Sequence, residues 1–313
     1  MANDNEFIRF DWAVKHMLRD KSNFSILEGL ISVLLGENIT IVEILESESN
    51  QVSRSDKFNR VDVKAKNSKG HIIIVEVQLT RQLNYLERIL YGVSKAIVEH
   101  LNLGDSYDKV KKVYSISILY CDMGKGDDYV YHGTTEFRGM HTGNTLLINS
   151  RDREVLKMTS PSKIMPEFYI IRVNQFSKIP ENYLDEWVNY LKTGQVKEGS
   201  RAPGLPEVRE KLKVLNMTAQ ERRDYDAHID ALRTQNDVLA SYRIEGLEEG
   251  RVMGLMEGRA QGLLEGRAES HEQGLLEGRA EGRAEQAMDI ARKMRDAGMK
   301  PDQIRSITGI DIE

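Results

Sequence analysis

The chain has 313 residues, of which 40% are hydrophobic and 30% charged, with a net charge of −5, so it can bury at least one sizeable core in one or two domains. Its single cysteine, Cys121, excludes an internal disulfide and a cysteine-based zinc site. The N-terminus lacks the pattern of a secretory signal and no apolar run approaches the roughly 20 residues that span a bilayer, so we expect a cytoplasmic protein that does not enter a membrane.

Helical and strand patterns alternate along the first two thirds of the chain. Apolar residues recur at helical spacing in three segments, which predicts helices over residues 11–35, 83–103 and 183–192. β-branched runs and alternating patterns predict strands over residues 39–45, 60–66, 71–79, 113–120 and 168–173. Together these elements indicate an α/β domain over residues 6–195.

The last third of the chain has a different composition. A Gly/Pro-rich linker is expected over 196–206, and a helical segment over 207–243. Residues 244–285 form an arm that repeats an eight-residue unit, Gly-Leu-x-Glu-Gly-Arg-x-x, and a C-terminal helical segment follows over 286–313. Each glycine costs about 1 kcal/mol relative to alanine inside a helix, so an isolated helix here is expected to be marginal. Two interpretations stay open: a solvated, partly helical extension, or an arm that forms homo-oligomers or binds a partner.

Two acidic residues, Asp62 and Glu76, lie on neighbouring predicted strands. They stand opposite each other in an antiparallel pair if the numbers of paired residues sum to 138. That register leaves residues 68–70 as a three-residue loop, in which Gly70 suits the left-handed conformation. Gln78 then projects to the same face of the sheet as Glu76.

This group of oxygen donors suits metal-dependent hydrolysis of a phosphodiester. Mg²⁺ prefers hard oxygen ligands, which the carboxylates of Asp62 and Glu76 and the backbone carbonyl of Val77 could supply. The Gln78 amide could orient water or hold a phosphate oxygen, but it cannot act as a general base. The alternative is that these residues are solvated strand ends.

A basic stretch surrounds the two acids, with twelve Lys/Arg against seven Asp/Glu between residues 51 and 112. Within the helix predicted after Gln78, Arg88, Tyr91 and Lys95 fall on one stripe at i, i+3 and i+7. With Arg60, which precedes the acids, they could bind substrate phosphates in a salt-dependent manner. An ordinary exposed helix face is the alternative.

The chain resembles the Rpn family of recombination-promoting nucleases, also described as transposases, in the PD-(D/E)XK nuclease superfamily. The resemblance rests on the order of its motifs, which are Phe10-Asp-Trp-Ala-Val-Lys15, Arg60-Val-Asp62, Val75-Glu-Val-Gln78, Arg88-x-x-Tyr91, Leu103-Gly-Asp-Ser-Tyr107 and Trp187-Val-Asn-Tyr-Leu191. The Glu-Gly-Arg arm and the closing segment 297–309 also recur in such proteins.

The resemblance implies a PD-(D/E)XK restriction-endonuclease-like core, a mixed central sheet flanked by helices, followed by a helical C-terminal extension. It also implies a Mg²⁺-dependent DNA endonuclease in which Asp62 and Glu76 bind the metal and Gln78 stands where the superfamily usually has lysine. Glu28 and Asp11 compete as the N-terminal acidic ligand. The competing hypothesis is a catalytically decayed DNA- or protein-binding module that oligomerises through its C-terminal arm.

Overall fold

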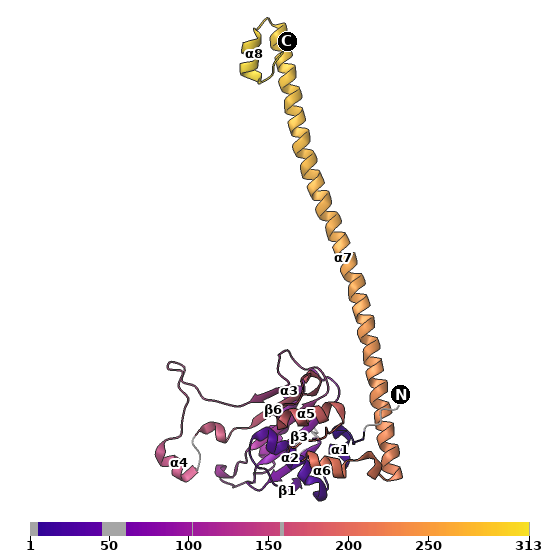
Figure 1. The fold of residues 1–313 in the computed structure, drawn as a ribbon. Helices are drawn as coiled ribbons and strands as arrows, with labels where there is room; N and C mark the ends of the chain where they lie inside the picture. Colours follow the sequence, from indigo (N-terminus) through magenta and orange to yellow (C-terminus); the bar gives the residue numbers. More distant parts are fainter. Residues whose placement is uncertain (1–5, 46–60, 102, 157–159, 313) are drawn as a thin grey trace. The chain divides into compact units, whose positions relative to one another are not determined.

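The computed structural model describes residues 6–45, 61–101, 103–156 and 160–312. Its contacts divide the chain into two compact units, residues 1–228 and 229–313. The first unit is built around one mixed sheet with helices on both sides, and the second is dominated by a single long helix (Figure 1).

The sheet has six strands in the order β1-β2-β3-β4-β6-β5. The three central strands β3, β4 and β6 are parallel, and the strands outside them pair in antiparallel fashion. The strands are β1 (Ile41–Leu45), β2 (Val63–Asn67), β3 (Ile72–Gln78), β4 (Val113–Leu119), β5 (Val130–Gly133) and β6 (Glu167–Arg172). This arrangement confirms the predicted mixed sheet, to which the short edge strand β5 is an addition that the sequence patterns did not indicate.

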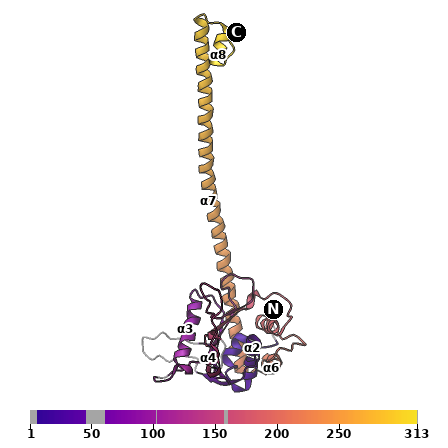
Figure 2. The ribbon, with the colours of Figure 1, turned by 90° about the vertical axis from the view of Figure 1, so that its left-hand side faces the viewer.

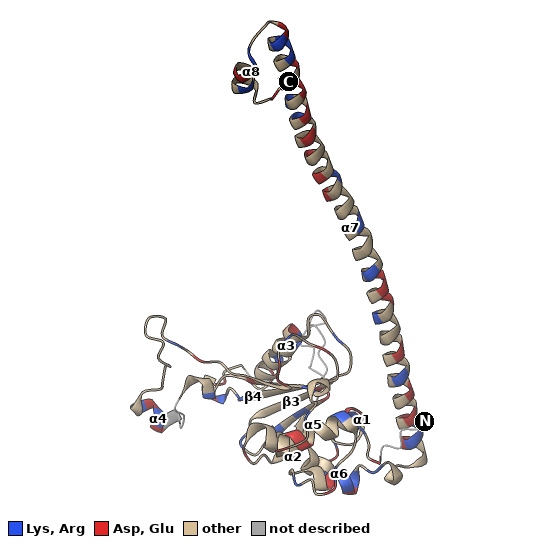
Figure 3. Ribbon diagram, turned by 45° about the horizontal axis from the view of Figure 1, so that its top comes forward, with Lys and Arg blue, Asp and Glu red and all other residues tan. Residues whose placement is uncertain are grey.

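Helices cover both faces of this sheet. The α-helices of the first unit are α1 (Phe10–His16), α2 (Phe24–Leu35), α3 (Tyr85–Val98), α4 (Ser150–Leu156), α5 (Tyr183–Thr193) and α6 (Leu205–Lys211). Its 3₁₀ turns are η1 (Lys21–Asn23), η2 (Tyr107–Lys109), η3 (Pro161–Lys163), η4 (Val173–Gln175) and η5 (Val214–Asn216). Helices α2 and α6 lie side by side (Figure 1 and Figure 2). Helix α3 lies on the opposite face of the sheet from α1, α2, α5 and α6 (Figure 3).

The centre of the sheet is buried on both faces, as its continuous apolar sequence predicts. Ile72 and Ile74 pack against Val93 and Ala96 of α3. The alternate residues of β3 point to the other face and are buried as well. The polar side chains at the carboxyl end of β3 therefore lie at the edge of a well-packed core.

The predicted helix over 11–35 is interrupted. It consists of α1, a turn and η1, and α2, because the Asp20 carboxylate accepts hydrogen bonds from the backbone and hydroxyl of Ser22 and starts a new turn. Apolar spacing continues across this break, so periodicity alone could not reveal it.

The segment expected as a linker, 196–206, packs into the first unit. Ala202 and Leu205 are fully buried, and the Trp187 indole donates to the Pro203 carbonyl at 2.9 Å. Pro203 and Gly204 approach Gly29 of α2 closely, which composition alone could not distinguish from a flexible connection.

The long helix α7 (Ala219–Asp296) includes all nine glycines of the repeat and carries charges of both signs along its length (Figure 3). At each of these glycines, an added Cβ would meet nothing within 4 Å. A turn with Gly298 at φ +84° leads into α8 (Pro301–Thr308). Ile304 of α8 is buried, as is Ala291 of α7. None of the described helices combines the length and apolar character that a membrane crossing requires.

Candidate active site

The β2–β3 hairpin has the predicted register. Val63 pairs with Val75 and Lys66 with Ile72, so the numbers of paired residues sum to 138. The connecting loop closes with Gly70 at φ +79°, as expected for a three-residue connection. One step beyond the last pair, this register brings Asp62 level with Glu76.

Asp62 lies immediately before β2 and is held at both its side chain and its backbone. Its Oδ2 atom accepts a hydrogen bond of 2.7 Å from the Val77 backbone N–H. Its own carbonyl oxygen accepts two hydrogen bonds from the Arg19 guanidinium, at 3.1 Å from Nε and 2.6 Å from Nη2. Because N–H and C=O of one strand residue point to the same side, the Val77 carbonyl faces the side on which the Asp62 carboxylate lies.

Glu76 is a buried carboxylate, only 7% exposed. Burial raises the pKa of its carboxyl group; the Arg88 guanidinium opposes this rise, and the Asp62 charge adds to it. The Arg88 Nη2 atom lies 3.4 Å from Glu76 Oε1. A cation placed between two neighbouring carboxylates stabilises their charged forms, most of all when one of them is desolvated. A pair of acids of this kind therefore suits a divalent metal ion.

Gln78 lies on the same face as Glu76 and is also buried. Its amide nitrogen donates to the Thr80 carbonyl at 2.5 Å, which fixes the orientation of the amide group. From this position beside Glu76, the Gln78 amide could orient water or bind a phosphate oxygen. It cannot accept a proton.

Two polar residues beside the acids were not singled out from the sequence. Ser117 of β4 stands opposite Glu76 in the parallel register and is 1% exposed. The Tyr85 hydroxyl is buried close to Glu76 and Ser117. Burial, as the main cause, raises the Tyr85 pKa well above its usual range, so the hydroxyl stays protonated. The signal in the sequence was a pair of serines, Ser115 and Ser117, within an otherwise apolar strand.

The predicted phosphate-binding residues are only partly brought to the acids. Arg88 reaches Glu76, and its Nη1 atom also donates to Gln82 at 3.1 Å. Tyr91 and Lys95 are half-buried on α3, along the stripe that the spacing predicted. Arg60 lies outside the described residues.

The structure does not bring Glu28 or Asp11 to the acid pair. Glu28 Oε1 accepts from the Ile41 backbone N–H at 2.6 Å, and Ile41 pairs with Asn67 at the opposite end of β2 from Asp62. Asp11 is fully buried and is held by Arg9 at 2.9 Å and by His228 at 2.8 Å.

The donor set around β3 suits a hard divalent cation. The carboxylates of Asp62 and Glu76 and the Val77 carbonyl supply only oxygen atoms, the donors that Mg²⁺ prefers. Within the described residues, no three side chains of His, Cys, Asp or Glu gather at one point. Water and substrate oxygens would therefore complete the coordination, as is usual for Mg²⁺.

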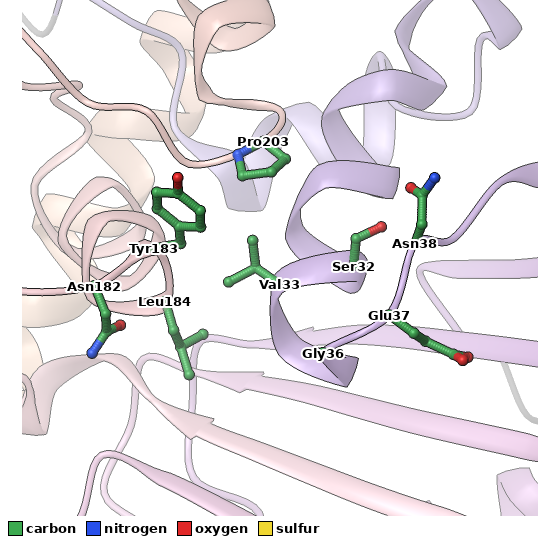
Figure 4. A pocket seen from close by; sticks show the side chains of 9 residues that line it. All are labelled: Ser32, Val33, Gly36, Glu37, Asn38, Asn182, Tyr183, Leu184 and Pro203. Carbon is green, nitrogen blue, oxygen red and sulfur yellow. The ribbon is translucent and has the colours of Figure 1, made fainter.

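A pocket of about 520 Å³ lies away from these residues (Figure 4). It opens between the end of α2, the start of α5 and Pro203, and it is lined by Ser32, Val33, Gly36, Glu37, Asn38, Asn182, Tyr183, Leu184 and Pro203. None of the predicted site residues lines it, so the acid pair is the better candidate for chemistry.

A family model described as PD-(D/E)XK nuclease family transposase matches residues 8–241. No curated protein and no solved structure matches the chain. The family match spans the whole sheet and both acids, whereas the narrower Rpn resemblance stays a prediction. Since the match covers most of the sequence, the chain belongs to the PD-(D/E)XK nuclease family of transposases.

Proposed function

We propose that this protein is a metal-dependent DNA endonuclease that hydrolyses phosphodiester bonds and promotes recombination or acts with a mobile element. The observation that carries the proposal is the meeting of Asp62 and Glu76 at the carboxyl end of β3, in a chain of a nuclease family. Members of this family typically use divalent metal ions, and the oxygen donors present suit Mg²⁺.

Each residue has a distinct role in this proposal. Asp62, Glu76 and the Val77 carbonyl would hold Mg²⁺. When bound, the ion lowers the pKa of attacking water and neutralises charge at phosphorus. Gln78 would orient that water or a phosphate oxygen. It takes no proton, so the proton must pass to solvent or to a substrate oxygen.

The basic residues would hold the DNA backbone. Arg88 stands beside Glu76 and would contact the phosphate nearest the acids, whereas Arg60, Tyr91 and Lys95 would contact flanking phosphates. Such contacts release counterions, so DNA affinity should fall as salt concentration rises.

A nicking assay on supercoiled DNA, with Mg²⁺ or with EDTA, tests the proposal. Asp62→Ala and Glu76→Ala should lower cleavage by at least about 100-fold, because each removes a metal ligand. Glu87→Ala, which removes an exposed carboxylate from the same helix as Arg88, is the matched control and should cleave like wild type. Cleavage that survives both acidic substitutions would rule the proposal out.

The second candidate is a binding module without catalysis that assembles through its arm. Gln78 in place of the lysine usual in the superfamily favours it, as do the exposed apolar side chains of α7, among them Leu247, Leu263 and Leu275. It predicts unchanged DNA binding in the acidic variants and loss of assembly in a chain that ends at Arg243. Light scattering that gives the same oligomeric state for both chain lengths would exclude the assembly.

A further inference from the structure

The connection between α1 and η1 is a tightly built turn. Leu18 is fully buried, and its backbone N–H donates to Ala13 at 2.9 Å. The Asn23 side-chain amide donates to the Met17 carbonyl at 3.1 Å and closes the turn from the other side. Arg19 therefore projects from a backbone that is fixed on both sides of it.

From this turn, Arg19 reaches a residue 43 positions away in the sequence. Its guanidinium donates through Nε and Nη2 to one atom, the carbonyl oxygen of Asp62, at 3.1 and 2.6 Å. The contact is to the backbone of Asp62 and leaves the carboxylate to other partners. The Val77 N–H holds that carboxylate separately, at 2.7 Å.

The hydrogen bonds from Arg19 matter because Asp62 lies just outside the paired part of the hairpin. It precedes the first residue of β2, where the ladder with β3 has not yet begun. A rotation of its backbone would turn the carboxylate away from Glu76, since alternate residues of a strand face opposite sides of the sheet. Two hydrogen bonds to its carbonyl oppose that rotation.

Arg19 and Arg88 thus act on the acid pair in different ways. Arg88 approaches the Glu76 carboxylate itself, at 3.4 Å. Arg19 donates to a backbone atom of Asp62, and through this contact it acts on a bound metal by setting the position of Asp62.

We propose that Arg19 is a positioning residue, which holds the Asp62 carboxylate in the orientation that binds the metal ion. The proposal rests on the metal-dependent function inferred above. Outer partners that orient a metal ligand typically change metal affinity by 10–100-fold when they are removed. A residue that only contacted DNA phosphate would instead change the KM for DNA and leave metal affinity intact.

The test compares Arg19→Gln, Arg19→Lys and the control Lys21→Gln in the full chain. The control removes an exposed positive charge two residues away, at the start of η1. Binding of Mn²⁺ alone, measured by calorimetry without DNA, should weaken about 10–100-fold in Arg19→Gln. Arg19→Lys should recover part of the affinity through one remaining hydrogen bond, and Lys21→Gln should match wild type. With excess metal, kcat should recover while the KM for DNA stays unchanged.

A second measurement does not depend on metal or activity. Hydrogen exchange of the Val77 amide reports its bond to Asp62, so Arg19→Gln should accelerate it about fivefold, the factor expected for loss of one ordinary hydrogen bond. If wild type neither binds Mn²⁺ nor cleaves DNA, the proposed function fails, and the exchange rate still tests the positioning. Wild-type exchange at Val77 in Arg19→Gln would overturn the proposal, as would a rise in the KM for DNA with Mn²⁺ binding unchanged.

Discussion

At the scale of single residues, Glu76 is a buried carboxylate whose negative charge is only partly compensated. A carboxylate that is 7% exposed loses most of its hydration, and the Arg88 guanidinium lies 3.4 Å from it. The raised pKa of Glu76 expresses this imbalance between burial and charge compensation. The fold therefore holds an ionised Glu76 at a cost, which a bound divalent ion would offset.

This cost predicts a pH-dependent gain in stability for Glu76→Gln. Because the folded-state pKa lies above the ordinary value of 4.5, folding favours the protonated carboxyl. The stability that this preference contributes is fully present below pH 4.5 and is lost as pH rises through the folded-state pKa. Without metal, Glu76→Gln should therefore unfold at a higher temperature than wild type at pH 7, and the difference should vanish towards pH 4.

Thermal unfolding followed by circular dichroism at several pH values measures this effect. Glu87→Gln serves as the control, since this carboxylate is exposed on α3. Addition of Mg²⁺ should reverse the order at pH 7, because only the wild type keeps the carboxylate ligand. If Glu76→Gln is less stable than wild type at pH 7 in EDTA, burial of the ionised Glu76 carboxylate does not destabilise the fold.

At the scale of secondary structure elements, the close approach of α2 to the segment around Gly204 brings the helical layer together. A Cβ added at Gly29 would lie 2.5 Å from the Gly204 Cα and would overlap the Pro203 carbonyl oxygen. The same segment binds Trp187 of α5 through that carbonyl. Three pieces of chain thus meet at a point where only glycine has room.

Gly29→Ala should therefore destabilise the first unit by roughly 3 kcal/mol, as overpacking of a rigid contact does. Gly36→Ala is the comparison, because Gly36 has φ +68° with nothing within 4 Å of an added Cβ. It should cost only about 1–2 kcal/mol, the penalty of a left-handed conformation for alanine. Urea unfolding measures the free energy of unfolding of both variants. A smaller loss of this free energy for Gly29→Ala than for Gly36→Ala would show that the backbone around Gly29 moves to make room for the methyl group.

At the scale of the whole molecule, the glycines of α7 are the least explained feature. Each lowers helix propensity by about 1 kcal/mol relative to alanine, yet no neighbouring atom within the described residues requires a glycine at these positions. If no second helix packs against α7, replacing these glycines by alanine should make the helix more stable. If a second helix approaches closely at the glycines, the alanine methyl groups should hinder that contact.

Triple substitution of Gly254, Gly258 and Gly262 by alanine separates these cases. For a helix without close neighbours, the substitution should stabilise α7 by about 3 kcal/mol, raise its melting temperature and leave the mass of the protein in solution unchanged. Circular dichroism and light scattering measure the two quantities. A lower melting temperature together with a lower mass would instead support an oligomer formed through the arm.

The sequence by itself determined the local geometry of the candidate site. Alternation and turn chemistry predicted the β2–β3 register and the left-handed Gly70, and hence the approach of Asp62 to Glu76. These features are readable because a hairpin depends on residues that are close in the chain.

Only the tertiary structure decided which distant residues support that site. It joined Arg19 to Asp62 and placed Tyr85 and Ser117 beside Glu76, while it held Glu28 at Ile41. It also buried Val196, Ala202 and Leu205, although the composition of the segment 196–206 indicates a linker. The physical reason is that such contacts form between elements whose order in space depends on burying the whole sheet, and periodicity along the chain carries no record of that order.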